Sequence, residues 1–204
     1  MSQQNDKVED VDLNQEWICW EYYRSQVKST SHDPDIYIKD NKQIFKFQKL
    51  SQFTYIWKNS AFGDPLKVFA DQHQKIFKID DREVEIETLS IFKNGIKPMF
   101  EDEANKEGCD YQFLINKDSQ DEYKDKVRKI WEYLVMNLIV AENKFKDIIC
   151  GIRIADKVFK SQIRLEIWIK EEKNMDFYDY LKKAFSDLLK IDVKDQIFQV
   201  SHKH

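Results

Sequence analysis

The segment from Asp121 to Ala141 carries the pattern that most constrains the fold of this 204-residue chain. Apolar residues recur in it at steps of three and four, which places their side chains on one face of an α-helix. These residues are Val127, Ile130, Trp131, Leu134, Leu138 and Ile139. We expect that apolar face to lie on a β-sheet formed by the rest of the chain.

Short runs rich in aromatic and β-branched residues predict the strands of that sheet. Trp17 to Tyr23 is aromatic and apolar at successive positions, which is typical of a central strand packed on both faces. Further strands are expected at 44–47, 85–92, 111–116, 151–157, 163–170 and 197–201, and further helices at 51–60, 65–73 and 176–190. Strands outnumber helices, and turn signals such as Asn94-Gly95 favour hairpin-like connections. The expected fold class is therefore α+β, with a mainly antiparallel sheet backed by helices.

One globular domain is expected over residues 13–204, because a hydrophobic content of 42% is ample for a core. Residues 1–12 are polar and acidic and are expected to form a flexible tail. Between Arg24 and Lys42 the residue types are those of loops, so a long loop is expected there.

Composition excludes several classes of protein. Cys19, Cys109 and Cys150 are widely spaced and form no C-x-x-C pattern, which argues against a zinc site and a disulfide framework. This cysteine usage favours the cytoplasm, with the nucleus as the other reducing compartment. No run of 18 apolar residues occurs, so no membrane span is expected. The formal net charge of −4 means that any contact with nucleic acid must be local.

A second apolar stripe accompanies the core face of the long helix. Tyr133 and Met136 are one turn apart there, and Phe53 and Trp57 are one turn apart in the helix expected at 51–60. These residues either close the edge of the core or form an exposed groove for a partner helix. The pattern alone leaves both interpretations open.

The residues Phe100-Glu101-Asp102-Glu103 place an aromatic ring next to three acids. A ring face beside a carboxylate can hold a planar cationic base by stacking and hydrogen bonding. The alternative is an aromatic plug beside a solvated acidic loop, and the pattern alone favours the plug. A metal site is not expected, because consecutive side chains do not converge on one ion.

Several segments resemble, in order and spacing, the eukaryotic translation initiation factor 4E family, whose members bind the mRNA cap. They are Trp17-Ile-Cys-Trp20, Trp57, Asn94 to Gly108, Ile130-Trp131, Cys150-Gly151 and Ile167-Trp168. The resemblance covers about Leu13 to His202, and its specific part is the block from Gly95 to Gly108. It implies a curved antiparallel sheet with helices on its convex face.

The resemblance also implies a base-binding site. In that family the methylated guanine lies between two tryptophans, and a glutamate accepts hydrogen bonds from the edge of the base. These roles would fall on Phe100 and Glu101, with Trp168 against the methyl group. The loop 24–42 contains no tryptophan, so Tyr37 is the best substitute for the other ring. The positive charge of 7-methylguanine makes a ring face and a carboxylate a suitable pair.

For the cap phosphates the family uses basic residues on the hairpin before the methyl-contacting tryptophan. Lys157, Lys160 and Arg164 are the matching candidates in this chain. The hairpin between Cys150 and Trp168 is two residues longer than the family pattern, so its register is open.

On the helical side the resemblance implies a surface for a peptide from a scaffold protein like initiation factor 4G or from a 4E-binding repressor. The matching residues are Phe53, Trp57, Tyr133 and Met136. The resulting hypothesis is binding of the 7-methylguanosine cap of mRNA in translation initiation or its regulation. No enzymatic activity, cofactor, metal or membrane is expected. The alternative is an interaction subunit that keeps the fold and has lost cap binding.

Overall fold

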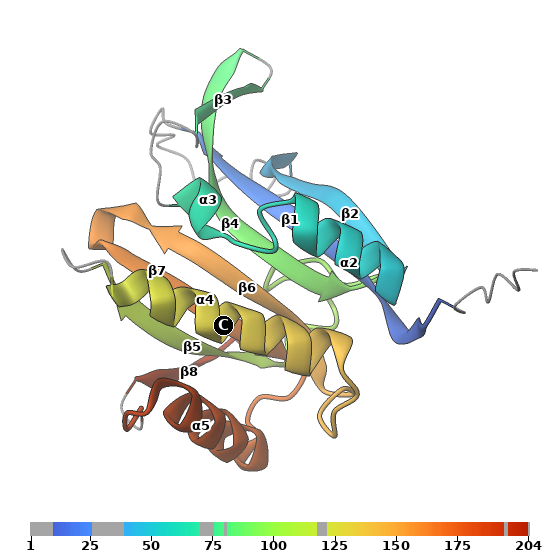
Figure 1. Ribbon diagram of the computed structural model, residues 1–204, viewed down its shortest axis with the longest axis vertical. Coiled ribbons are helices and arrows are strands. Elements are labelled where there is room, and N and C mark those ends of the chain that lie inside the picture. Colours follow the sequence, from blue (N-terminus) through green and yellow to red (C-terminus); the bar gives the residue numbers. More distant parts are fainter. Residues whose placement is uncertain are drawn as a thin grey trace, which may run out of the picture.

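The computed structural model describes residues 10–25, 39–69, 76–79, 81–117, 122–193 and 196–203. These residues form one twisted sheet with helices packed against one of its faces (Figure 1). The tail expected at residues 1–12 lies largely outside the described residues. Asp10, Val11 and Asp12 of this segment are described: Asp10 and Val11 hydrogen-bond to Ser51 and Leu50, and Asp12 begins the first strand.

The sheet has eight strands in the order β2-β1-β4-β6-β7-β5-β8, with β3 paired to β4 outside this path. The strands are β1 (Asp12–Ser25), β2 (Asn41–Lys49), β3 (Ile76–Ile79), β4 (Arg82–Lys93), β5 (Cys109–Asn116), β6 (Ile149–Lys157), β7 (Gln162–Ile169) and β8 (Ile197–Ser201). Every strand pair in the described part of the chain is antiparallel. The predicted α+β class with an antiparallel sheet is therefore confirmed.

The helices lie together on one side of this sheet (Figure 1). They are α2 (Leu50–Asn59), α3 (Leu66–Phe69), α4 (Glu122–Leu134) and α5 (Met175–Leu189), and α4 continues into a π-helical turn, η1 (Val135–Val140). The periodic residues of the 121–141 segment are all buried against the sheet, from Val127 at 0% exposure to Ile139 at 4%. The predicted amphipathic helix is confirmed, although its last turn is π-helical and not α-helical.

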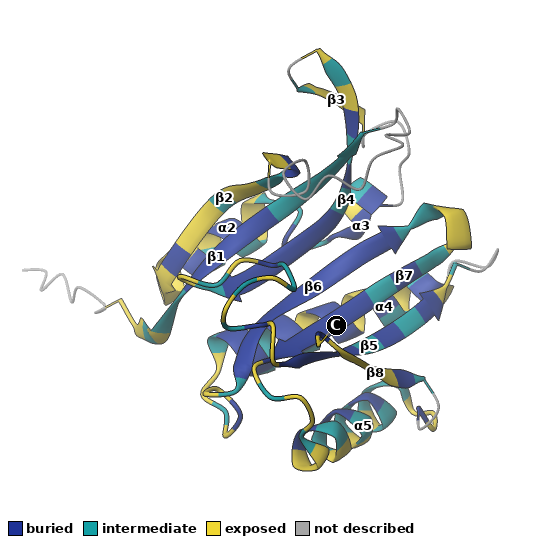
Figure 2. Ribbon diagram, turned by 180° about the vertical axis from the view of Figure 1, so that it is seen from behind, coloured by how far each residue is buried: buried dark blue, intermediate teal, exposed yellow. Residues whose placement is uncertain are grey.

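A second, smaller apolar cluster occupies the face of the sheet opposite the helices. Because side chains alternate between faces along a strand, Ile18, Trp20, Phe92 and Trp168 point away from the helix-backed core. Figure 2 shows this face, with buried residues along the central strands. The base of a binding site on this face would be formed by these buried strands.

The connection from β4 to β5 differs from the expected hairpin. Gly95 makes the expected turn, with a φ of +88° that suits glycine. However, β4 pairs with β1 and β6, whereas β5 pairs with β7 and β8. Residues 94–108 therefore form a long loop between strands that are not neighbours, because a local turn signal does not determine which strands pair.

Candidate functional site

The loop 94–108 is shaped by two of its own side chains. The Asp102 carboxylate accepts hydrogen bonds from the backbone N–H groups of Lys97 and Ala104, both at 3.0 Å. The Asn105 amide donates to the carbonyl oxygens of Lys97 (2.8 Å) and Met99 (2.9 Å). These bonds close the loop around Phe100 and fix where its ring is presented.

The ring of Phe100 lies parallel to the indole of Trp168. Their centroids are 4.8 Å apart and their planes differ by 8°. Trp168 belongs to β7 and is fully buried, whereas Phe100 is half-buried. The stack therefore joins a ring carried by the loop to a ring carried by the sheet.

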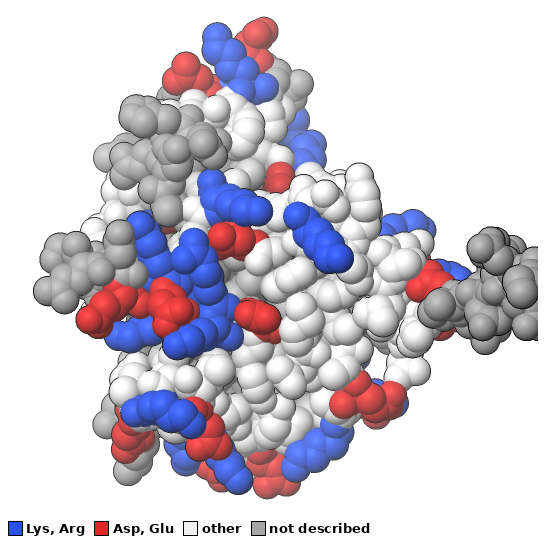
Figure 3. Space-filling model, viewed as in Figure 1, with Lys and Arg blue, Asp and Glu red and all other residues white. Residues whose placement is uncertain are grey.

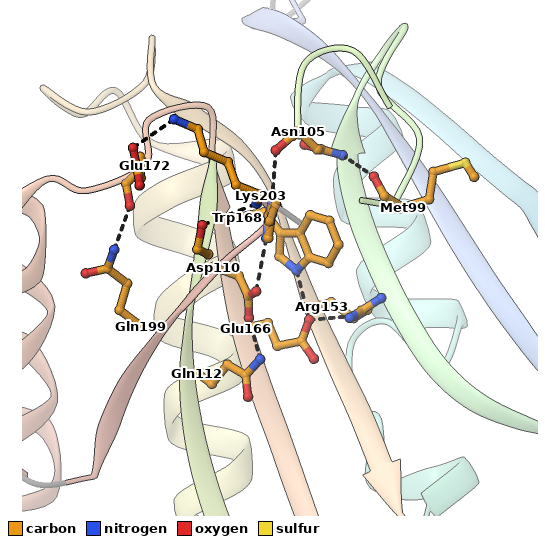
Figure 4. A network of polar contacts seen from close by, with 12 residues as sticks. Met99, Asn105, Asp110, Gln112, Arg153, Glu166, Trp168, Glu172, Gln199 and Lys203 are labelled. Carbon is orange, nitrogen blue, oxygen red and sulfur yellow. Dashed lines mark hydrogen bonds and ion pairs between the residues drawn. The ribbon is translucent and has the colours of Figure 1, made fainter. Parts of the chain in front are cut away.

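A buried charge network holds Trp168 in place (Figure 4). Its indole Nε1 donates to Oε2 of Glu166 at 2.8 Å, and Nε of Arg153 donates to the same oxygen at 2.6 Å. Nε of Arg164 lies 2.5 Å from the other oxygen, as an ion contact and not an aligned hydrogen bond. Burial alone would raise the pKa of Glu166, but the two guanidinium groups outweigh it and lower the pKa. Glu166 is thus a fixed anion behind the ring stack.

His202 contacts both rings of the stack. Its centroid is 4.8 Å from that of Phe100 and 4.5 Å from that of Trp168. Its ring nitrogens lie 2.9 Å from the Asn105 carbonyl oxygen and 3.0 Å from Asp110 Oδ1. The ring is therefore buried between the loop 94–108 and the sheet.

A hollow of about 350 Å³ opens beside the stack, lined by Phe100, Glu101, Lys106, Glu107, His202 and Lys203. Glu101 is exposed and follows Phe100 directly in the loop. The hollow therefore offers an aromatic ring, carboxylates and ammonium groups to one ligand. This combination suits a planar base that carries positive charge and is attached to an anionic group.

The structure brings two of the four expected base-binding residues to this hollow, Phe100 and Glu101. Trp168 has no exposed surface, because Phe100 and His202 cover it. In this arrangement it supports Phe100 from behind, and the direct contact with a methyl group expected for Trp168 is not available. Tyr37 lies outside the described residues.

The three expected phosphate-binding cations lie farther along the β6–β7 hairpin. Lys157 pairs with Glu87 at 2.8 Å, and Arg164 is held by Glu166. Lys160 is exposed in the 3-10 turn between the strands, η2 (Val158–Lys160), and makes no ion pair with another described residue. Lys157 pairs with Gln162 across the hairpin. Gln162 is six residues before Trp168 on β7, so Lys157 lies about 20 Å along the strand from the Trp168 ring.

Arg153 is the cation that sequence reasoning missed. It pairs across the strands with Glu166, two residues from Trp168, and its guanidinium lies 4.7 Å from the Trp168 ring. A signal was present in the sequence, because Arg153 and Glu166 each interrupt an apolar strand. Two opposite charges within the apolar stretches of neighbouring strands indicate a buried pair.

The four residues expected to form a groove on the helical side lie at different depths. Phe53 is buried at 5% exposure and packs under the half-buried Trp57, with ring centroids 5.7 Å apart, so the expectation of an exposed Phe53 is wrong. Tyr133 turns toward α5, where its hydroxyl lies 2.7 Å from that of Tyr180. Met136 is half-buried. The helix side nevertheless shows a broad area without charged side chains (Figure 3).

A hollow of about 480 Å³ lies between α4 and α5, lined by Tyr133, Tyr180, Lys183, Ala184, Asp187 and Leu188. Trp57 does not line it.

The cysteines are unsuited to nucleophilic chemistry. All three are free and buried, and burial raises the pKa of each thiol, to about 12 for Cys109 and about 11 for Cys150. In the described part of the chain no group of three or more His, Cys, Asp or Glu side chains could hold a metal ion. No helix among the described residues is long and apolar enough to cross a membrane.

A family model for eukaryotic initiation factor 4E matches residues 12–204 of the chain. The eukaryotic translation initiation factor 4E of Candida albicans is 26% identical over 164 residues, which cover 78% of this chain and 64% of that protein. The chain spans between half and two thirds of the length of the first curated relatives that it matches.

Two solved structures share the fold. One is C. elegans eIF4E-3 in complex with the 4E-binding protein Mextli, at 18% identity with a TM-score of 0.70, covering 95% of this chain and 94% of that one. The other is Ascaris suum eIF4E-3 in complex with an m7G cap, at 18% identity with a TM-score of 0.69, covering 95% and 92%. At this level of identity the two likenesses establish the fold.

Proposed function

The chain belongs to the eukaryotic initiation factor 4E family, and on that premise we propose that it binds the 7-methylguanosine cap of mRNA in translation initiation or its regulation. One related structure holds an m7G cap and another holds a 4E-binding protein. We extend both kinds of binding to this chain as proposals.

The observation that carries the cap proposal is the Phe100 ring beside the exposed Glu101 at one hollow. Methylation at N7 gives guanine a positive charge, which is attracted to a ring face and to a carboxylate. The N–H groups on the edge of the base can donate to Glu101 while the base stacks on Phe100. Ordinary guanine lacks the charge and gains less from both contacts.

Trp168 makes Phe100 a better platform than its exposure alone suggests. A phenyl ring attracts a cation less strongly than an indole does. The parallel stack on a buried tryptophan fixes the orientation of Phe100, so less side-chain freedom is lost when a base binds. Tyr37 stays the proposed second ring of the sandwich.

For the phosphates we propose Lys157, Lys160 and Arg164, with Lys160 the most available. Lys160 is exposed at the turn, whereas the other two are engaged by carboxylates. A flexible triphosphate would have to follow the strands toward the turn to reach it.

On the helical side we propose that a helical peptide from a scaffold or repressor protein docks over Trp57 and Met136. Both residues are half-buried, and Trp57 rests on the buried Phe53. An aromatic residue supported from below is a typical anchor at the centre of an interface. Tyr133 would contribute from the neighbouring surface beside α5.

The proposed activity is recognition without catalysis and without a cofactor, in the cytoplasm, with the nucleus as the second compartment. Retention on 7-methyl-GTP resin tests it. We expect the folded protein to be retained, to elute with free 7-methyl-GTP and to stay bound in GTP, and Phe100→Ala to be lost in the wash. Folded wild-type protein that passes through the resin would favour the interaction subunit that has lost cap binding.

A further inference from the structure

Phe159 is the most exposed of the large hydrophobic side chains in the described part of the chain, at 84%. It lies in η2, the turn between β6 and β7, which Figure 2 shows as an exposed segment at the end of this hairpin. The Ser161 N–H donates to the Val158 carbonyl oxygen at 3.1 Å, and the Ser161 carbonyl oxygen accepts from the Lys117 N–H at 2.8 Å. The ring is therefore presented to solvent by a turn that is bonded to the end of β5.

The surroundings of Phe159 distinguish it from the single exposed apolar residues that are common on protein surfaces. The guanidinium carbon of Arg24, on β1, lies 5.0 Å from the centre of the phenyl ring, within the range of a cation–π contact. Arg24 forms an ion pair with Glu85, and a Glu87 oxygen lies 3.7 Å from its second terminal nitrogen. A strand that is distant in sequence thus holds a cation against an exposed aromatic ring.

Lysine side chains complete the surroundings of the ring. Lys160 is the next residue of the turn and is exposed, and Lys157 and Lys117 come from the adjoining strand ends. Lys157 pairs with Glu87 at 2.8 Å. Lys117 pairs with Asp156 at 2.6 Å. Lys160 is therefore the cation at the turn that no carboxylate in the described ranges engages.

The ring lies at the face of the sheet that also carries the hollow beside Phe100. Tyr23 and Ile86, which pair across β1 and β4, pack into the helix-backed core. Because side chains alternate between faces, the next pair, Arg24 and Glu85, points to the opposite face. The turn is about 20 Å along β7 from the ring stack. A base at the turn must therefore belong to a different nucleotide from a base in the hollow.

We propose that Phe159 is a stacking platform for a base of the RNA that follows the cap, with Lys160 beside it at the RNA backbone. An aromatic ring accepts any base, because every base has a π-face, and neighbouring cations attract the phosphates. Arg24 covers one face of the ring, so the base stacks on the other. A protein partner matches less well, because the apolar surface at the turn is one ring among charged side chains. The order, with the cap in the hollow and the RNA at the turn, rests on the proposed function.

Calorimetric titrations of the full chain with 7-methyl-GTP, a capped RNA of about five nucleotides and the same RNA without its cap test this site. We expect the wild type to bind the capped RNA about tenfold more tightly than 7-methyl-GTP, the effect of one base–aromatic stack. Phe159→Ala should lose most of this difference and bind 7-methyl-GTP as the wild type does. Phe159→Trp keeps a stacking surface and should retain the tighter binding.

Tyr55→Ala is the matched control, because Tyr55 is an aromatic side chain on the helical side with 68% exposure. It should bind all of these ligands as the wild type does. Circular dichroism establishes that each variant is folded, which we expect because both rings are exposed.

The outcomes separate this site from the proposed function. Equal wild-type affinities for capped RNA and 7-methyl-GTP would overturn the site. So would a Phe159→Ala variant that binds capped RNA like the wild type, which is the result expected if the turn docks a protein. A wild type that binds uncapped RNA as tightly as capped RNA and does not bind 7-methyl-GTP contradicts the proposed function. The RNA site is then supported if Phe159→Ala weakens binding of the uncapped RNA, and overturned if it does not.

Discussion

At the scale of single residues, Glu101 is the side chain that we expect to distinguish the methylated base. It lines the hollow next to Phe100 and is exposed, so its carboxylate is free to turn toward a base. Glu101→Ala should lose at least about 1.5 kcal/mol of binding free energy, because one charge-assisted hydrogen bond is removed. Tryptophan fluorescence titrated with 7-methyl-GTP measures this. Glu103→Ala, in the same loop but outside the hollow, is the control, and equal losses in both variants would contradict the assignment.

Charge reversal at Lys160 tests the phosphate proposal with the smallest expected loss of stability. Lys160 is exposed, whereas Lys157 and Arg164 are held by Glu87 and Glu166. Lys160→Glu should weaken binding of the triphosphate cap analogue by about fivefold and leave the monophosphate nearly unchanged. The wild-type preference for the triphosphate should shrink as salt is added. Lys129→Glu, on the helical side, is the control. Equal affinities of Lys160→Glu and Lys129→Glu for the triphosphate analogue would show that Lys160 does not contact the phosphates.

Glu166 is the residue on which the support of the ring stack depends. Glu166→Gln keeps an acceptor for the Trp168 indole but removes the buried negative charge that pairs with Arg153 at 2.6 Å and with Arg164 at 2.5 Å. We expect urea unfolding to show a loss of about 3 kcal/mol, against less than about 0.5 kcal/mol for Glu83→Gln on the exposed side of β4.

The same residue sets a pH dependence of stability. Because the pKa of Glu166 is lowered in the folded protein, its contribution is fully present above the ordinary carboxyl pKa and is lost as the pH falls toward the folded value. The wild type should therefore lose more stability on acidification than Glu166→Gln does. A parallel decline in both proteins would show that Glu166 does not carry this effect.

At the scale of elements, α2 is the helix that we expect to anchor a partner peptide. Trp57→Ala should weaken binding of a helical peptide from a 4E-binding protein by about thirtyfold, the equivalent of about 2 kcal/mol. Tyr55→Ala is the control, because Tyr55 is 68% exposed on the same helix and does not rest on Phe53. Circular dichroism establishes that both variants are folded. An equal affinity of Trp57→Ala and wild type would remove α2 from the interface.

Most elements could be predicted from the sequence because their patterns are local. The strand expected at 197–201 and the helix expected at 176–190 match β8 and α5 within one residue at each end. The short strand β3 was missed, and the Asn94-Gly95 turn was expected to close a hairpin. Pairing between strands is not local, and a turn signal carries no information about it.

The site was predictable only in part, for the same physical reason. The block around Phe100 and Glu101 is contiguous, so its pattern is visible in one segment. His202 contacts Asn105 and Asp110, which are 97 and 92 residues away, and no pattern near His202 in the sequence indicates such partners. The spacing of Phe53 and Trp57 showed a shared helix face but not the depth at which each side chain lies.

At the scale of the whole molecule, the sheet separates the two binding sites that we propose. One face packs against the helices and carries the surface proposed for a protein partner (Figure 1). The opposite face, seen in Figure 2, carries the ring stack of Phe100 and Trp168 with the hollow beside it. The strands between them are buried on both faces, from Ile91 on β4 to Trp168 on β7. A ligand on one face and a peptide on the other can therefore bind at the same time without competing for surface.

The central claim is that this chain binds methylated guanine selectively because the methylated base carries a positive charge. Paired calorimetric titrations with 7-methyl-GTP and GTP test this claim most directly. The two ligands carry the same phosphates and differ only in the methyl group and its charge. We predict at least roughly tenfold tighter binding of 7-methyl-GTP, with the difference reduced in Phe100→Ala and Glu101→Ala. Equal dissociation constants for the two nucleotides in the wild type would contradict the account.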